Sequence, residues 1–363
     1  MRILDFVKSS NTTKKSMPLE IEIINPLVYP DWDNLVLSKR GYSIFHSSSW
    51  AKVLHESYGY KPLYFTLINS GRMDALIPFM EVKSILTSKK GVSLPFSDYC
   101  VPIIPENNGF GEIFTFLIES GKKFGWKSIE IRNGNIFAQD LLPAAYYYQH
   151  TLDLSINNDE QIFSNFRDST KRNIKKAIKE DVTVGRYQSL EAINEFYQLN
   201  CQTRKGHGLP PQPYYFFEKI YEHIISKKLG FVALASYNNK VIAGAVYFHF
   251  GTNAIYKYGA SMKEYQNLRV NNLIMWEAIK WYSQNGYKNF SFGRTEPENH
   301  GLLQFKEGWG AEEEIIKYYK YDLRKGEFVK DSSIARGIHN KIFNKMPMPL
   351  LKIIGTVLYK HMG

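Results

Sequence analysis

The sequence has little cysteine, no long apolar run and none of the short motifs that mark common catalytic sites. Only Cys100 and Cys201 occur among its 363 residues, which excludes a disulfide framework and a cysteine-based zinc site. We interpret both as buried small apolar residues. No stretch approaches the roughly 18 consecutive apolar residues of a membrane-spanning helix. The motifs G-x-S-x-G, H-E-x-x-H and G-x-x-x-x-G-K-[ST] are absent, and the nine histidines are scattered, so we expect no metal site.

Basic residues outnumber acidic ones, with 46 Lys and Arg against 35 Asp and Glu and a net charge of +11. This excess favours a polyanionic partner, which is tRNA, an anionic lipid surface or a phosphate-bearing substrate, and it does not choose among them. Hydrophobic residues make up 44% of the chain and aromatic residues 15%, which excludes a disordered or fibrous protein. The first ten residues carry no signal-peptide pattern, so we expect a cytoplasmic protein.

The length indicates two domains. Residues 1–40 form a polar lead-in, residues 41–150 and 151–330 are two α/β units, and residues 331–363 are a basic amphipathic tail. Each unit shows the order helix, hairpin, helix, strand. The segment 124–131 also resembles 285–292, and each ends a helix at a glycine and starts a strand soon afterwards. We interpret this as an internal duplication.

Two basic segments fall outside this repeat. Residues 166–179 predict a helix with Arg172, Lys176 and Lys179 on one face and Ile174, Ala177 and Ile178 on the other. The cationic face is either an anion-facing surface or simply solvated. The tail contains an apolar run at 350–359. It either lies on an anionic membrane surface at the inner face of the membrane or packs on the body of the protein.

Two further segments carry residues suited to ligand binding. Residues 203–208 are a weak match to the R/Q-x-x-G-x-G/A loop that cradles the pyrophosphate of CoA in N-acetyltransferases. With three prolines following, 203–213 predicts a stiff loop between helices. Arg204 offers a bidentate fork for phosphate or carboxylate, with Lys205 beside it. The alternative is an ordinary loop with surface cations.

The second segment is 290–310. A strand ends there at Gly293, which places Arg294 at a carboxyl end, where α/β folds bind ligands. A loop follows, and then a short helical turn carries Phe305 and Lys306. Taken alone, this turn could equally be a surface lysine beside a core phenylalanine.

At these residues the chain resembles the Fem-type (FemAB-related) aminoacyl and acyl transferases, a branch of the GNAT superfamily with two GNAT-like units in tandem. The matching stretches cover most of residues 41–325, and the last is the most specific. They are 45–50, 94–99, 167–177, 204–213, 258–276 and 292–310. The chain is more similar to the FemAB-related acetyltransferase-like proteins than to peptidoglycan bridge enzymes. It lacks the long coiled-coil insertion that some bridge enzymes carry.

The resemblance implies an α/β fold (α+β mixed) of two GNAT-like units, each a mixed, mostly antiparallel sheet flanked by helices. It also implies N-acyl transfer, in which an amine attacks an activated ester or thioester and a tetrahedral oxyanion forms. Lys306 would stabilise that charge and Phe305 would pack beside the acyl group. The expected donor is aminoacyl-tRNA or acyl-CoA, with no tightly bound cofactor. The expected acceptor is an amine of a cell-envelope or polysaccharide precursor.

Other residues are expected to contact the substrates. Arg294 and Arg204 would hold a phosphate or carboxylate, while Asn271 and Asn272 start a helix whose amides could hold an anion. The remaining candidates are Trp50, Asp98 and Tyr99 in the first unit, and Tyr256 and Tyr258, which alternate along a strand of the second. No residue is an obvious general base. The competing hypothesis is a non-catalytic membrane-surface adaptor in envelope or exopolysaccharide assembly, with a vestigial acyltransferase cleft.

Overall fold

The computed structural model describes residues 21–104, 110–133, 141, 143–156, 158–330 and 338–363. The chain divides into two compact units. Unit 1 comprises Met1–Tyr146, Ile316–Ser332 and Lys360–Gly363, and unit 2 comprises Tyr147–Ile315 and Ser333–Tyr359. The ranges predicted from the sequence are contiguous, whereas these units are not. Residues 331–337 of the predicted tail lie outside the described residues, as do 1–20 of the lead-in.

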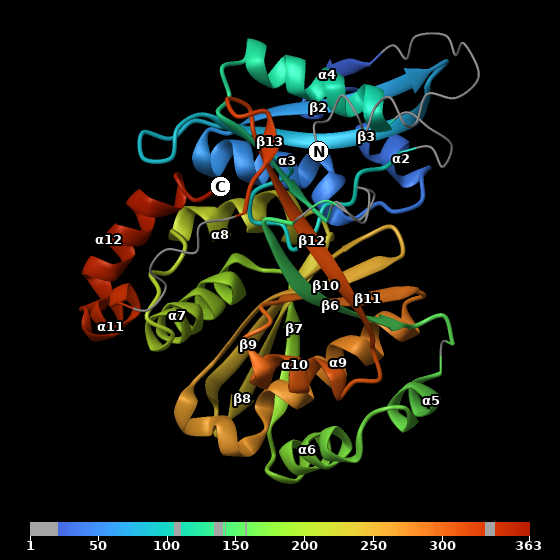
Figure 1. Cartoon of the computed structure of the whole chain (residues 1–363). Helices are drawn as coiled ribbons and strands as arrows, with labels where there is room; N and C mark the ends of the chain where they lie inside the picture. The colour runs from blue at the N-terminus through green and yellow to red at the C-terminus, as the bar shows by residue number, and fades with distance from the viewer. Residues whose placement is uncertain (1–20, 105–109, 134–140, 142, 157, 331–337) are drawn as a thin grey trace. The chain divides into compact units, whose positions relative to one another are not determined.

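Unit 1 contains six strands in one ladder, a seventh short strand at its side, and helices around them (Figure 1). The strands follow the order β1-β2-β3-β4-β5-β12. All neighbours are antiparallel except β4 and β5, and a short β13 pairs with β12. The elements are β1 Glu22–Ile24, α2 Trp32–Leu37, η1 Ile44–His46, α3 Ser48–Tyr58, β2 Lys61–Asn69, β3 Arg72–Val82, β4 Lys90–Val92, α4 Phe110–Lys123, β5 Ser128–Arg132, β12 Glu312–Asp322 and β13 Glu327–Phe328.

Unit 2 repeats this sheet. Its strands follow the order β7-β8-β9-β10-β11-β6, and only β10 and β11 are parallel. The elements are β6 Ala145–Asp153, α5 Asp159–Ser164, α6 Asp168–Lys179, β7 Thr183–Tyr187, α7 Leu190–Gly206, α8 Tyr214–Ile220, the π-helical η2 Tyr221–Ile225, β8 Gly230–Tyr237, β9 Lys240–Phe250, β10 Asn253–Ser261, η3 Lys263–Leu268, α9 Val270–Gln284, β11 Asn289–Thr295, α10 His300–Glu307, α11 Ile338–Lys345 and α12 Met348–Tyr359.

The two halves of the chain exchange their final strands. Strand β6 follows β5 in the sequence but pairs with β11, and β12 follows β11 but pairs with β5. In each unit a helix, α4 or α9, links the two parallel strands, because a parallel pair needs a crossover connection. The predicted fold of two mixed, mostly antiparallel units is therefore confirmed.

Local sequence explains the repeated elements. Strands β2 and β3 are joined by Ser70 and Gly71, and β8 and β9 by Asn238 and Asn239, all four with positive φ. Two-residue turns of this kind match the twist of antiparallel strands and favour Gly and Asn. The predicted N-cap of α3 is also confirmed, since the Ser47 side chain accepts a hydrogen bond from the Trp50 amide.

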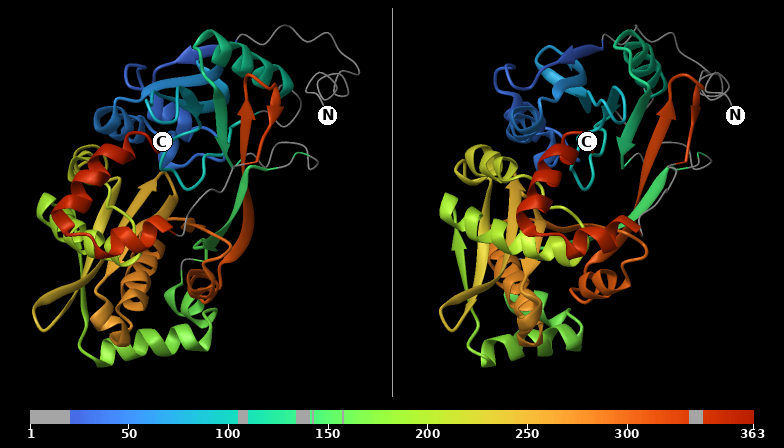
Figure 2. Two further views of the ribbon diagram at one scale, coloured as in Figure 1. Left: turned by 60° about the vertical axis from the view of Figure 1, so that its left-hand side comes forward. Right: turned by 90° about the vertical axis from the view of Figure 1, so that its left-hand side faces the viewer.

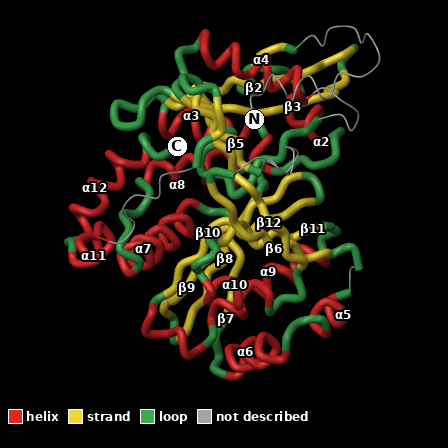
Figure 3. Tube along the Cα trace, viewed as in Figure 1, coloured by secondary structure: helices red, strands yellow, loops and turns green. Residues whose placement is uncertain are grey.

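Helices cover both faces of the unit 2 sheet. Tyr247 and Phe248 are neighbours on β9 and so point to opposite faces. Tyr247 packs in the core beneath α9, while Phe248 contacts Tyr258 on the side of α7 and α8. Figure 3 shows the strands between these helices. Helix α6 in turn packs on α9. It buries Ile174 and Ala177, but Ile178 is exposed, contrary to prediction.

The C-terminal helices α11 and α12 pack beside α7 (Figure 2). Helix α7 runs to Gly206, so Arg204 and Lys205 are helical, and the prediction that they lie in a loop is wrong. The helix continues this far because the first helix-breaking residue after Leu190 is Gly206 itself. Within the part of the chain that the structure describes, no helix has both the length and the apolar character needed to span a bilayer.

Candidate functional site

Lys306 is a buried lysine at the end of α10. The Asn299 side chain caps this helix by accepting from the Leu302 amide. Only 2% of Lys306 is exposed, and its Nζ donates to the carbonyl oxygens of Gly293 (2.9 Å) and Arg294 (3.1 Å). Buried lysines are rare because desolvation penalises the charge. Two fixed carbonyl acceptors thus hold this ammonium at the carboxyl end of β11, away from open solvent.

A bulge in β11 presents those carbonyls. The pairing of β11 with β6 shifts register between Ser291 and Arg294, and Gly293 has a φ of 69°. Glycine suits this left-handed backbone because it has no Cβ to clash. The glycine inside an otherwise apolar strand pattern is the sequence signal for the bulge.

The parallel strands β10 and β11 separate next to this bulge. Their pairing covers Asn253–Ile255 of β10 and Asn289–Ser291 of β11 and then stops, although both strands continue. Strand β10 also shifts register against β9, between Tyr256 and Tyr258. The carboxyl ends of parallel strands lie at one edge of a sheet, the edge where α/β folds bind ligands.

Phe305 is half-buried beside Lys306. Its ring meets Trp309 edge-on at 5.7 Å, and the buried Trp309 packs on Phe166 at 5.0 Å. Helix α10 ends close against α6, because a Cβ on Gly308 would lie 2.4 Å from Thr170 Oγ1. This contact fixes the position of the turn that carries Phe305 and Lys306.

Arg294 is half-buried, and its guanidinium carbon lies 4.4 Å from the centre of the Tyr147 ring. On β6 and β11, several buried polar atoms lack hydrogen-bond partners, namely Gln149 Oε1, Thr295 Oγ1 and His150 Nδ1. Such atoms are uncommon in folded proteins because each one carries a desolvation cost. These atoms lie on the paired strands β6 and β11, and the carbonyls that hold Lys306 belong to β11.

His150 is the residue that sequence reasoning missed. It is fully buried, and its Nε2 lies 3.2 Å from a Glu313 carboxylate oxygen. Burial lowers the pKa of His150, and the nearby Lys306 charge lowers it further, against the opposing effect of Glu313. The imidazole is therefore neutral at pH 7. A single histidine in a strand pattern gave no signal of this position.

His150, Glu307 and Glu313 present ligand atoms within 4.8 Å of one another. Such a set could hold a cation. However, Arg167 Nη2 already lies 2.9 Å from Glu307, and the Lys306 ammonium adds a second positive charge. We interpret the group as an ion-pair network around Lys306.

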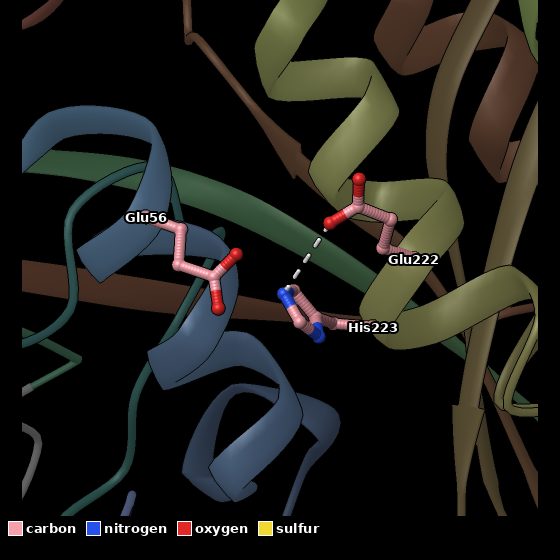
Figure 4. Close-up of side chains that lie close together, drawn as sticks. All are labelled: Glu56, Glu222 and His223. Carbon is pink, nitrogen blue, oxygen red and sulfur yellow. Dashed lines mark ion pairs between the residues drawn. The ribbon is translucent and has the colours of Figure 1, made fainter.

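Another acid–histidine pair lies on η2, where His223 Nε2 is 3.9 Å from Glu222 (Figure 4). Since Glu222 also pairs with Lys219, we assign this pair no chemistry.

Tyr256 and Tyr258 lie on opposite faces of the sheet. The bulge between them moves Tyr256 onto Tyr247, with its hydroxyl over Gly259, while Tyr258 packs between Phe248 and the helices α7 and α8. Without the bulge, residues two apart would share a face.

Three elements meet at the carboxyl end of β10. Thr203 Oγ1 of α7 accepts from the Ser261 amide at 3.2 Å, and Asn271 Nδ2 of α9 donates to Ser261 Oγ at 3.3 Å. Asn272, next to Asn271, is buried, whereas Lys205 is half-buried. Arg204 Nη2 donates to the Tyr359 hydroxyl at 2.8 Å. The structure therefore places Asn271 at the carboxyl end of β10, whereas the Arg204 guanidinium is bonded to α12.

The predicted residues of unit 1 are less uniform. Trp50 is fully buried against Phe45, which leaves it no surface for a ligand. Asp98 and Tyr99 are half-buried; the Asp98 carbonyl accepts from the Tyr318 hydroxyl, and Tyr99 packs on Phe45. Cys100 and Cys201 are free and buried as predicted, and burial raises the pKa of both thiols.

Comparison with known proteins identifies the fold. Residues 164–307 match the acetyltransferase (GNAT) domain family. Over 85 residues the chain is 32% identical to a lipid II:glycine glycyltransferase of Staphylococcus haemolyticus. The aligned region covers 22% of this chain and 20% of that protein. The chain thus spans about a fifth of the length of the curated relatives it matches.

Two solved structures share the fold of most of the chain. The crystal structure of FemX gives a TM-score of 0.65 at 15% identity, covering 84% of this chain and 98% of FemX. A tandem GNAT protein from the clavulanic acid biosynthesis pathway gives 0.52 at 8% identity, with the same coverage of 84% and 98%. The chain therefore contains a GNAT domain at residues 164–307 and has the tandem fold of FemX, and its partial sequence match to glycyltransferases agrees with the resemblance to Fem-type transferases.

Proposed function

We propose that the protein is an N-acyltransferase that moves an aminoacyl group from aminoacyl-tRNA to an amine of a cell-envelope precursor. The observation that carries this proposal is the Lys306 ammonium, fixed by the Gly293 and Arg294 carbonyls at the carboxyl end of β11. A cation held in place before the reaction stabilises charge that develops only in the transition state.

The chemistry follows from that position. The acceptor amine attacks the carbonyl carbon of the donor ester, a C–N bond forms and the carbonyl oxygen becomes anionic near Lys306. The C–O bond to the tRNA then breaks. The amine proton passes to water or to the leaving oxygen. Although His150 is neutral, it is fully buried and cannot contact the amine. Its place beside Glu313 and Lys306 suits a positioning role.

The entrance to α9 favours aminoacyl-tRNA over acyl-CoA. Gln266 to Asn271 follow the spacing of the pyrophosphate-cradling motif, but Arg269 and Asn271 stand at its two small positions. Small residues let backbone amides approach a phosphate closely. Here Arg269 itself adopts the left-handed conformation, with a φ of 60°. The net charge of +11 also suits tRNA, and the matched relatives are named as glycyltransferases.

The test is transfer by the purified full-length protein. One reaction receives bulk tRNA charged with a labelled amino-acid mixture and another receives labelled acetyl-CoA, each with a soluble amine-bearing muropeptide as acceptor. Acid-stable label from tRNA alone supports the proposal. Label from acetyl-CoA would overturn the choice of donor, and label from neither would overturn the activity. Location at the inner face of the membrane is part of the same proposal.

A further inference from the structure

Helix α12 carries a stripe of exposed aliphatic side chains. Leu350, Ile353 and Val357 are 47%, 61% and 53% exposed. Their spacing of three and four residues places them on one side of the helix. Burial of large apolar residues stabilises proteins, so an exposed stripe of this kind indicates a binding surface.

The opposite side of α12 is firmly attached to unit 2. Gly355 lies so close to Pro211 that a Cβ there would be 2.1 Å from its carbonyl oxygen. The Tyr359 hydroxyl accepts from Arg204 and donates to the Pro210 carbonyl at 3.2 Å. These contacts fix which side of α12 faces unit 2. The stripe lies on the other side, so it is not the side by which α12 packs on unit 2.

The charge of the tail sequence points to the partner of the stripe. The predicted tail, residues 331–363, contains five Lys and Arg and one acid, Asp331. Helix α11 adds the exposed Lys345 and Ile342, the latter 56% exposed. Apolar side chains combined with an excess of cations complement an anionic lipid surface. A protein partner would need an acidic rim around an apolar centre, whereas an anionic bilayer supplies both features along its whole surface.

We propose that the exposed stripe of α12, aided by the exposed Ile342 and Lys345 of α11, docks on an anionic membrane. Twelve residues of helix extend about 18 Å, well short of a bilayer core of about 30 Å. Helix α12 therefore lies in the interface plane with its stripe among the headgroups. The inference rests on the proposed function in that it explains how the protein reaches an acceptor with a lipid anchor.

The experiment measures sedimentation of the full-length protein with two kinds of vesicle, pure phosphatidylcholine and mixed phosphatidylcholine–phosphatidylglycerol. The variant is Ile353→Ser/Val357→Ser. The matched control is Ile178→Ser/Ile315→Ser, which removes two aliphatic side chains of similar exposure, 55% and 48%, elsewhere on unit 2. Each methylene that enters the membrane contributes about a fourfold factor in affinity. We expect wild type and control to bind the mixed vesicles, and the stripe variant to bind about tenfold or more weakly.

Three results would overturn the inference: equal losses in the stripe variant and the control, no loss in the stripe variant, or tight binding to phosphatidylcholine alone. Gel filtration adds a fourth, because a wild-type dimer that the stripe variant abolishes would assign the face to a second copy of the chain. Transfer to the soluble muropeptide separates this inference from the proposed function. The stripe variant should retain that transfer, since no residue of the stripe belongs to the Lys306 site.

Discussion

Replacing Lys306 with methionine tests whether its buried charge serves the reaction or only the fold. Methionine keeps much of the apolar length but removes the cation and leaves the Gly293 and Arg294 carbonyls without their donor. A buried acceptor left in this way costs roughly 1–3 kcal/mol. Two of them lower the free energy of unfolding by about 2–6 kcal/mol. A domain near the middle of the ordinary range of about 5–15 kcal/mol then stays largely folded at 25 °C.

The catalytic effect is separable from this loss. Removing one fixed group that stabilises an oxyanion lowers kcat by about 10²–10³-fold. Urea unfolding gives the stability, and single-turnover transfer of labelled aminoacyl groups gives the rate. The matched control is Lys89→Met, because Lys89 also donates to a backbone carbonyl, that of Phe124, and pairs with Glu81 in unit 1. It should lose stability but keep its transfer rate. A folded Lys306→Met protein with kcat within tenfold of wild type would refute the electrostatic role.

Three further outcomes are expected. Gly308→Ala should destabilise the protein by about 1–3 kcal/mol, because the new methyl meets Thr170 Oγ1, and Thr170→Ala should restore most of that loss in urea titrations; equal losses in both backgrounds would contradict the contact. Burial lowers the pKa of His46 to about 4. Below pH 6.5 the His46 imidazole is therefore protonated in the unfolded state but stays neutral in the folded state. The free energy of unfolding should fall by about 3 kcal/mol between pH 6.5 and 4. His46→Gln should flatten that part of the pH profile, and an unchanged slope would argue against it. Finally, Gly259→Ala should displace the Tyr256 ring, whose hydroxyl would lie 1.6 Å from the new Cβ; a Gly259→Ala crystal structure with Tyr256 in place would rule this out.

The order of elements could be predicted from local patterns. Glycine and asparagine at the two hairpin turns, and the serine before α3, carry their signal within a few residues. The exchange of β6 and β12 could not be predicted, because strand partners depend on long-range packing that alternating apolar residues do not encode.

The candidate site divides in the same way. The turn with Phe305 and Lys306 was found because it follows a strand that ends in glycine, and because the segment resembles a family. His150 and Thr295 were missed, since their significance depends on which strand lies beside them. Trp50 was assigned to a ligand although large aromatic residues are more often core. Arg204 was placed in a loop because three prolines follow, yet α7 continues through it to Gly206.

The exchanged strands also govern how the protein can be synthesised and dissected. The sheet of unit 1 lacks β12 until Tyr318–Asp322 have left the ribosome, nearly two hundred residues after β5, with which they pair. The Tyr60 hydroxyl donates a hydrogen bond to the Lys360 carbonyl, which is synthesised later still. An expression fragment that stops near residue 150 would expose the edge of β5 and carry a β6 with no β11 beside it. Such unpaired strand edges promote aggregation. We expect each half to be insoluble alone, and both to be soluble when they are co-expressed.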